Sequence, residues 1–94
     1  MEFMNRENIM SEVINVIGLG YIGLPTALML ASKGLKVIGT DLDEKKVDML
    51  QNSSLTFQEE GLAELYQKAV LNGIQFIRNS VTADVYIVSV PTPF

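Results

Sequence analysis

Three glycines and one aspartate have the types and spacing needed to bind a dinucleotide. Gly18, Gly20 and Gly23 form a G-x-G-x-x-G pattern, and Asp41 follows 18 residues after the last glycine. In such a pattern the first glycine permits a tight turn, the second lets the backbone approach a pyrophosphate, and the third allows close helix packing. An acid about 20 residues further on accepts hydrogen bonds from a ribose. These residues predict a dinucleotide site.

The charge of Asp41 selects between the two nicotinamide dinucleotides. A carboxylate at this position repels a 2′-phosphate, so we expect NAD and not NADP. A glycine fingerprint by itself is weak evidence, because the same glycines can form a turn that binds nothing. Asp41 has a second interpretation too, as a cap of the helix expected to start near Asp43. The flanking segments therefore have to support the site.

Those flanks have the order that the fingerprint requires. Residues 13–17 are β-branched at four of five positions and predict a parallel strand buried on both faces. Apolar residues at helical spacing then predict a helix over 22–31, with Pro25 in its first turn and Gly34 after its end. Residues 36–40 predict a second strand that ends at Asp41. The glycines thus stand between a strand and a helix, as in dinucleotide-binding domains.

A short amphipathic helix is expected over 43–52, with Asp43 as its N-cap. This places Lys46 in the first or second turn, near the adenosine end of a bound dinucleotide. Lys46 is then positioned to contact a ribose or a phosphate, although a solvated surface lysine fits the same spacing.

The second half of the chain predicts one more helix and two more strands. The helix covers residues 59–72, and the strands cover 74–77 and 85–90. We expect an α/β fold, a Rossmann-like partial doubly wound parallel sheet of about four strands in three αβα layers. The expected strand order is 3-2-1-4, which leaves an open apolar edge on the fourth strand. Thr92 then lies beside the glycine loop and lines the cofactor cleft, unless residues 91–93 form a proline-stiffened turn without contact.

Composition limits the remaining possibilities. The 94 residues are 48% hydrophobic and 19% charged, which is typical of a globular chain. A net charge of −4 argues against nucleic acid or an anionic membrane surface as a partner. There is no cysteine, no histidine and no apolar run long enough to span a membrane, so we expect a cytoplasmic protein. Residues 1–11 are expected to be a flexible leader, and residues 12–94 the N-terminal part of an NAD-binding domain.

Several motifs together resemble the UDP-glucose/UDP-N-acetylmannosamine dehydrogenase family. They are the run Gly-Leu-Gly-Tyr-Ile-Gly-Leu-Pro at 18–25, Asp41 with Lys46 and Val47, and Val-Pro-Thr-Pro at 90–93. The resemblance extends from about Val13 to Phe94, and the ending is similar to the UDP-N-acetylmannosamine branch in particular. The family usually has Glu-Pro-Gly-Leu where this chain has Glu-Glu-Gly-Leu at 59–62. This difference affects the start of the helix expected over 59–72 and not the cofactor site.

The resemblance implies an enzyme that oxidises the C6 alcohol of a UDP-sugar to a carboxylate with two NAD, through a thioester on a cysteine. It implies that Tyr21 and Ile22 meet the pyrophosphate, that Asp41 holds the adenine ribose with Lys46 nearby, and that Thr92 lines the cleft. The family's catalytic cysteine, its UDP-sugar domain and its long central helix lie further along its chains. We therefore expect this chain to be inactive alone, and the full-length protein to be a homo-oligomer.

Two other classes use a similar loop. A non-catalytic dinucleotide-sensing module would use the same glycines and Asp41, and the Pro-Thr-Pro ending favours the dehydrogenase over it. A methyltransferase-type adenosine site usually has G-x-G-x-G, and Ile22 occupies the place of its last glycine. The residues that select one UDP-sugar are not expected in this part of the family's chain.

Overall fold

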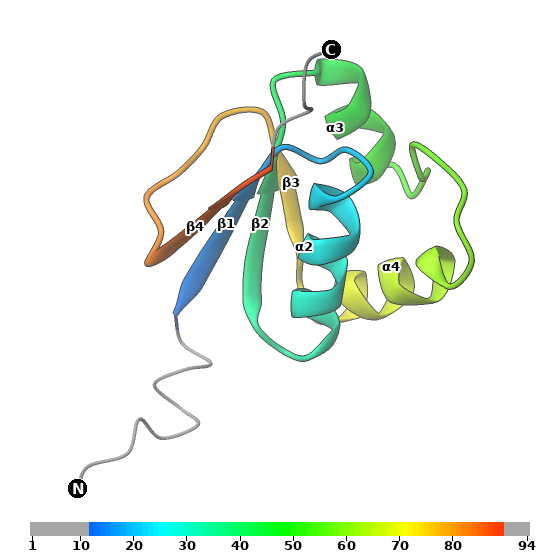
Figure 1. The fold of residues 1–94 in the computed structure, drawn as a ribbon, viewed down its shortest axis with the longest axis horizontal. Helices are drawn as coiled ribbons and strands as arrows, with labels where there is room; N and C mark the ends of the chain where they lie inside the picture. Colours follow the sequence, from blue (N-terminus) through cyan, green and yellow to red (C-terminus); the bar gives the residue numbers. More distant parts are fainter. Residues whose placement is uncertain (1–11, 90–94) are drawn as a thin grey trace, which may run out of the picture.

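The computed structural model describes residues 12–89, which form one parallel sheet covered by helices (Figure 1). The strands are β1 (Val13–Ile17), β2 (Lys36–Thr40), β3 (Gln75–Ile77) and β4 (Val85–Val88). Their order is β3-β2-β1-β4, and every neighbouring pair is parallel. The Rossmann-like fold and the strand order expected from the sequence are both confirmed. Within residues 12–89 the helices share one core on one face of the sheet, so two of the three expected αβα layers are present in this part of the chain.

Three helices connect the strands. They are α2 (Gly23–Ser32), between β1 and β2, and α3 (Glu44–Gln51) and α4 (Leu62–Leu71), both between β2 and β3. The side chain of Asp43 accepts hydrogen bonds from the backbone N–H groups of Lys45 and Lys46, so the predicted N-cap of α3 is confirmed. Within residues 12–89, no helix is both long enough and apolar enough to cross a bilayer.

The hydrophobic core lies between the sheet and these helices. Val16 of β1 and Val37 of β2 point into this core, because every second residue of a strand lies on the same face of the sheet. Helix α2 packs against both strands and against α4. The ring of Tyr66 on α4 stacks on Phe76 of β3, with the centroids 6.1 Å apart. The core therefore holds α2 and α4 on one face of the sheet, with the N-terminal end of α2 at the carboxyl ends of the strands.

The opposite face carries a buried polar residue. Asn15 in the middle of β1 is fully buried, and its Nδ2 donates to the carbonyl of Ile38 at 2.9 Å and to Oγ1 of Thr40 at 2.7 Å. Its Oδ1 accepts a hydrogen bond from the N–H of Val81, in the segment that joins β3 to β4. Asn15 thus ties the centre of the sheet to the connection that crosses this face.

Two boundaries differ from those expected. Helix α4 begins at Leu62 and not near Glu59, because Gly61 at its N-cap has a φ of +82°, which no helical residue adopts. Strand β3 begins at Gln75, one residue later than expected. The end of the fourth strand, predicted at Val90, lies outside the described residues. At the sheet edge, Tyr86 and Val88 of β4 are 50% and 64% exposed, so an apolar edge is present in the described part of the chain.

Candidate dinucleotide site at the glycine loop

Gly18 and Gly23 are glycines for steric reasons. Gly18 has a φ of +98°, and a Cβ on it would lie 1.7 Å from the carbonyl oxygen of Ser89. A Cβ on Gly23 would lie 1.7 Å from the carbonyl oxygen of Gly18. The loop therefore folds tightly between the end of β4 and the first turn of α2, and a methyl group at either position cannot fit without a backbone shift.

Gly20 has a different reason to be glycine. A Cβ built on it meets nothing within 4 Å, so the protein itself leaves the space in front of this backbone open. The N–H groups of Gly20, Tyr21 and Ile22 donate no backbone or side-chain hydrogen bond to another residue of the range 12–89. They stand just before the N-terminus of α2, where the helix dipole favours negative charge. This arrangement suits a phosphate.

Asp41 closes the site from the end of β2. Its Oδ2 accepts a hydrogen bond from the backbone N–H of Leu19 at 2.9 Å, and its Oδ1 accepts one from the N–H of Asp43 at 2.8 Å. The ammonium of Lys46 lies 3.8 Å from Oδ2. The side chain of Asp41 is 15% exposed and that of Lys46 is 36% exposed, so solvent reaches both. The carboxylate is held at the loop with lone pairs left for hydroxyl donors.

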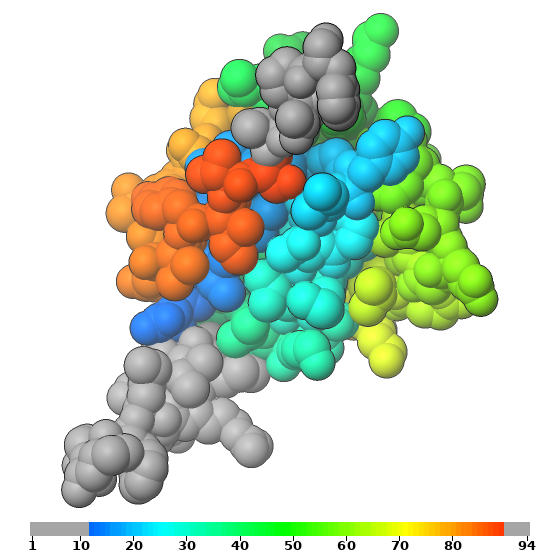
Figure 2. Space-filling model, viewed as in Figure 1, coloured from blue at the N-terminus to red at the C-terminus, as the bar shows by residue number. Residues whose placement is uncertain are grey.

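A cavity of about 400 Å³ joins these groups. Its walls come from the glycine loop, from the ends of β2 and β4, from α3 and from the segment before α4. The lining residues are Gly18, Leu19, Gly20, Tyr21, Ile22, Asp41, Lys46, Thr56, Phe57 and Ser89. In Figure 2, the glycine loop and α2 lie between the end of the chain's fourth strand and the region of α4.

Most residues predicted for the site meet at this cavity. Six of the eight line it, and Gly23 packs closely against the carbonyl group of Gly18, at the base of the glycine loop. Thr92 lies outside the described residues. Tyr21 and Ile22 are 79% and 74% exposed, so the loop presents them outward and not into the core.

Four lining residues were not predicted from the sequence: Leu19, Thr56, Phe57 and Ser89. Leu19 lies within the glycine loop itself. Ser89 follows β4, and its position beside Gly18 is visible in the sequence only as the end of an apolar run. Thr56 and Phe57 lie in a polar connection without periodicity, which offers no signal. Their presence in the wall depends on how α3 and α4 pack.

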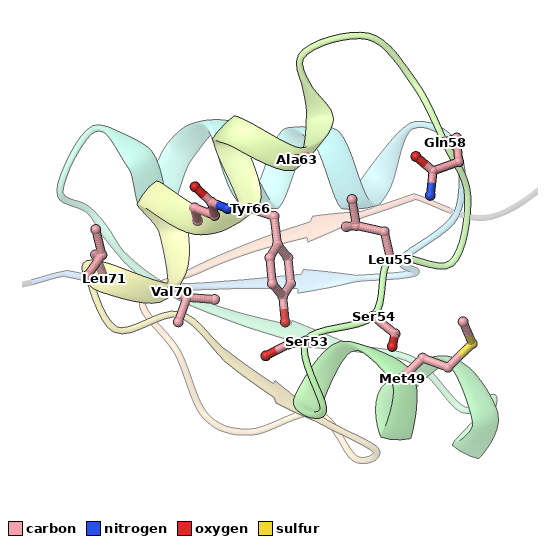
Figure 3. A pocket seen from close by; sticks show the side chains of 10 residues that line it. Met49, Ser53, Ser54, Leu55, Gln58, Ala63, Tyr66, Val70 and Leu71 are labelled. Atoms are coloured by element: carbon pink, nitrogen blue, oxygen red, sulfur yellow. The ribbon is translucent and has the colours of Figure 1, made fainter.

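A larger cavity, of about 870 Å³, lies elsewhere, between α3 and α4 (Figure 3). Tyr66 crosses it from α4 and donates a hydrogen bond from its hydroxyl to the carbonyl of Leu50. The other lining side chains are apolar, amide or hydroxyl groups: Met49, Ser53, Ser54, Leu55, Gln58, Ala63, Gln67, Val70 and Leu71. None of its lining residues carries a charged side chain, whereas Asp41 and Lys46 line the smaller cavity, so the smaller cavity is the better candidate for a charged cofactor.

Comparison with known proteins agrees with this geometry. Residues 12–94 match the model of the UDP-glucose/GDP-mannose dehydrogenase family, NAD binding domain. The UDP-N-acetyl-D-mannosamine dehydrogenase of Methanococcus aeolicus is 49% identical over 81 residues, which are 85% of this chain and 18% of that protein. The enzyme of the same name from Escherichia coli K12 is 45% identical over 84 residues, 86% of this chain and 20% of the relative. The chain thus spans about a fifth of the length of the curated relatives it matches.

Solved structures show the same likeness. The native UDP-N-acetyl-mannosamine dehydrogenase of Staphylococcus aureus superposes with a TM-score of 0.82 at 40% identity, over 86% of this chain and 20% of that one. GDP-mannose dehydrogenase of Pseudomonas aeruginosa superposes with a TM-score of 0.74 at 30% identity, over 85% and 20% of the two chains. The chain therefore belongs to the UDP-glucose/GDP-mannose dehydrogenase family and carries that family's NAD-binding domain.

Proposed function

We propose that these residues form the adenosine-diphosphate half of the NAD site in a dehydrogenase that oxidises the C6 alcohol of UDP-N-acetyl-D-mannosamine to a carboxylate. The choice of sugar nucleotide is supported by the two relatives at 45% and 49% identity, both of which are UDP-N-acetyl-D-mannosamine dehydrogenases. One observation carries the NAD site. The space in front of the Gly20 backbone is free of protein atoms, and Gly20 lines the same cavity as Asp41 and Lys46.

The residues fit the parts of NAD one by one. The N–H groups of Gly20, Tyr21 and Ile22 have no partner among the described residues 12–89 and suit the pyrophosphate oxygens. Asp41 is placed to accept hydrogen bonds from the adenine ribose hydroxyls, and Lys46 adds a positive charge beside it. Gly18 and Gly23 hold the loop in shape. Thr92 remains a predicted contact from the sequence.

The bound cofactor supplies the hydride acceptor, and this chain supplies its binding and orientation. The thioester chemistry that the resemblance implies needs a cysteine, and none is present among the 94 residues. We therefore infer that this chain alone does not oxidise a sugar, and that the catalytic and sugar-binding groups belong to other parts of the parent protein. A homo-oligomeric parent, a cytoplasmic location and a leader over residues 1–11 remain predictions from the sequence.

Two measurements test this proposal. Calorimetric titration of the 94-residue chain should show saturable binding of NAD and much weaker binding of NADP. The full-length parent protein should form NADH with UDP-N-acetyl-D-mannosamine, at a ratio of two NADH per sugar. NADH formation with UDP-glucose alone would overturn the substrate assignment but leave the NAD site intact, whereas NAD binding without turnover of any nucleotide sugar would indicate a sensing module.

A further inference from the structure

The segment between α3 and α4 forms a wall of the cofactor cavity that the glycine fingerprint does not include. Thr56 and Phe57 line the cavity from this segment, opposite the glycine loop. They lie 33 and 34 residues beyond Gly23 and have no place in the fingerprint. The chain has brought them there through the packing of α4 on α2.

An aromatic contact holds this wall against the glycine loop. The rings of Tyr21 and Phe57 have their centroids 4.7 Å apart, at an interplanar angle of 49°. Tilted pairs at this distance are favourable, because the positive edge of one ring approaches the negative face of the other. Tyr21 is otherwise exposed to solvent, so Phe57 is its anchoring neighbour. The contact sets the position of Thr56, the adjacent residue, relative to the loop.

Thr56 carries an unused polar group. Its Oγ1 is buried and has no hydrogen-bond partner within residues 12–89. A hydroxyl can donate one hydrogen bond and accept two, and leaving it buried and unbonded costs free energy. Buried polar atoms are nearly always bonded, and Thr56 lines the cavity, so a ligand that draws the hydroxyl to the cavity wall would supply the missing partner. The N–H groups of Gly20, Tyr21 and Ile22, which have no partner within residues 12–89, and the ammonium of Lys46 favour an anionic group on that ligand. The Asp41 carboxylate in the same wall suits its hydroxyl groups.

We propose that Thr56 is a further cofactor-binding residue, whose hydroxyl donates a hydrogen bond to a diphosphate oxygen of NAD. Phe57 is its positioning residue and acts through the contact with Tyr21. This inference rests on the proposed NAD site and assigns a residue outside the glycine fingerprint to it.

The test uses the 94-residue chain with Thr56→Val and Thr56→Ser. Valine removes the unbonded hydroxyl at nearly constant shape, so Thr56→Val should raise Tm in the absence of ligand. The same variant should weaken NAD binding about fivefold or more, because the donor is lost. Thr56→Ser keeps the donor and should bind NAD within about twofold of the wild type. A purely structural threonine would give the change in Tm without the change in affinity.

Other ligands identify the group that Thr56 meets. ADP-ribose contains the diphosphate, so its affinity should fall by the same factor as that of NAD in Thr56→Val, whereas adenosine should bind both proteins alike. An equal loss for adenosine would overturn the diphosphate assignment. Phe57→Ala should also lower NAD affinity, because the contact with Tyr21 is lost. Phe57→Tyr keeps an aromatic ring and should keep the wild-type affinity.

The possible failures are distinct. Wild-type binding of NAD with an unchanged affinity in Thr56→Val would overturn this inference and leave the proposed function standing. No binding of NAD by the wild type, at ligand concentrations that saturate the full-length protein, would overturn the proposal that these residues form a working half-site, and the role of Thr56 with it.

Discussion

The carboxylate of Asp41 accepts a hydrogen bond from the backbone N–H of Leu19 at 2.9 Å, so the acid at the end of β2 is joined to the glycine loop at the end of β1. Its other oxygen is bonded to the N–H of Asp43 at the start of α3. One side chain thus links three elements and faces the cavity. Its replacement should affect both the shape of the loop and the choice of cofactor.

Asp41→Asn should weaken NAD binding by about 10- to 100-fold, since a hydrogen bond to a charged group contributes about 1.5–3 kcal/mol. NADP affinity should rise relative to NAD, because the charge that repels the 2′-phosphate is gone and Lys46 remains nearby. Parallel calorimetric titrations with the two cofactors measure both changes. An unchanged ratio of the two affinities would contradict the role given to the carboxylate.

Gly18→Ala and Gly20→Ala form a matched pair. Gly18→Ala places a methyl 1.7 Å from the Ser89 oxygen at a positive φ, so it should lower the free energy of unfolding by about 3 kcal/mol or more. Gly20→Ala meets no protein atom and should change it by less than about 1 kcal/mol. Yet Gly20→Ala should reduce NAD affinity at least about tenfold, because the methyl occupies the space for the pyrophosphate. Urea unfolding and NAD titration of both variants check this; full NAD binding by Gly20→Ala would argue against a phosphate at this loop.

Asn15→Leu should destabilise the domain by about 2 kcal/mol or more, because Thr40 and the backbone of Val81 lose a buried partner. The loss should be smaller in a Thr40→Val background, where one of the orphaned groups has been removed. A double-mutant cycle in urea measures this coupling. Additive costs would show that the Asn15–Thr40 bond has no energetic weight.

Asp43→Ala should cost about 1 kcal/mol of stability, through loss of the N-cap of α3. Asp48→Ala is the control on the same helix: Asp48 is exposed, its ion pair with Arg78 is 3.7 Å long, and its removal should cost less than about 0.5 kcal/mol. Thermal unfolding of both variants distinguishes them. Equal costs would show that the cap does not stabilise this helix.

The open edge of β4 is expected to promote self-association of the 94-residue chain. Val88→Lys should reduce this association without a loss of stability, because Val88 is already 64% exposed at the edge of the sheet. Leu71→Lys is the matched control, since Leu71 is 85% exposed but lies at the end of a helix. Sedimentation velocity over a range of concentrations reports the change. The same reduction in both variants would indicate general solubility and not strand pairing.

Much of the fold was readable from the sequence because its signals are local. The apolar run of β1, the glycines after it and the helical spacing of α2 fall within 20 residues, and their order predicts a strand, a phosphate-binding turn and a helix. Asp43 was predictable as a cap for the same reason, since its bonds reach two and three residues along the chain. The start of α4 was predicted too early, because apolar spacing does not reveal the left-handed backbone of Gly61.

What the tertiary structure decided is which distant residues share the site. Ser89 limits the space at Gly18, and Phe57 contacts Tyr21, although long stretches of chain separate the members of each pair. The buried Asn15 likewise found its partners in β2 and in the connection before β4. No local pattern encodes such contacts, because they arise from the register of the strands and the packing of α4 on α2. The sequence therefore determined the chemistry of the glycine loop and Asp41, and the packing decided which side chains complete the walls around them.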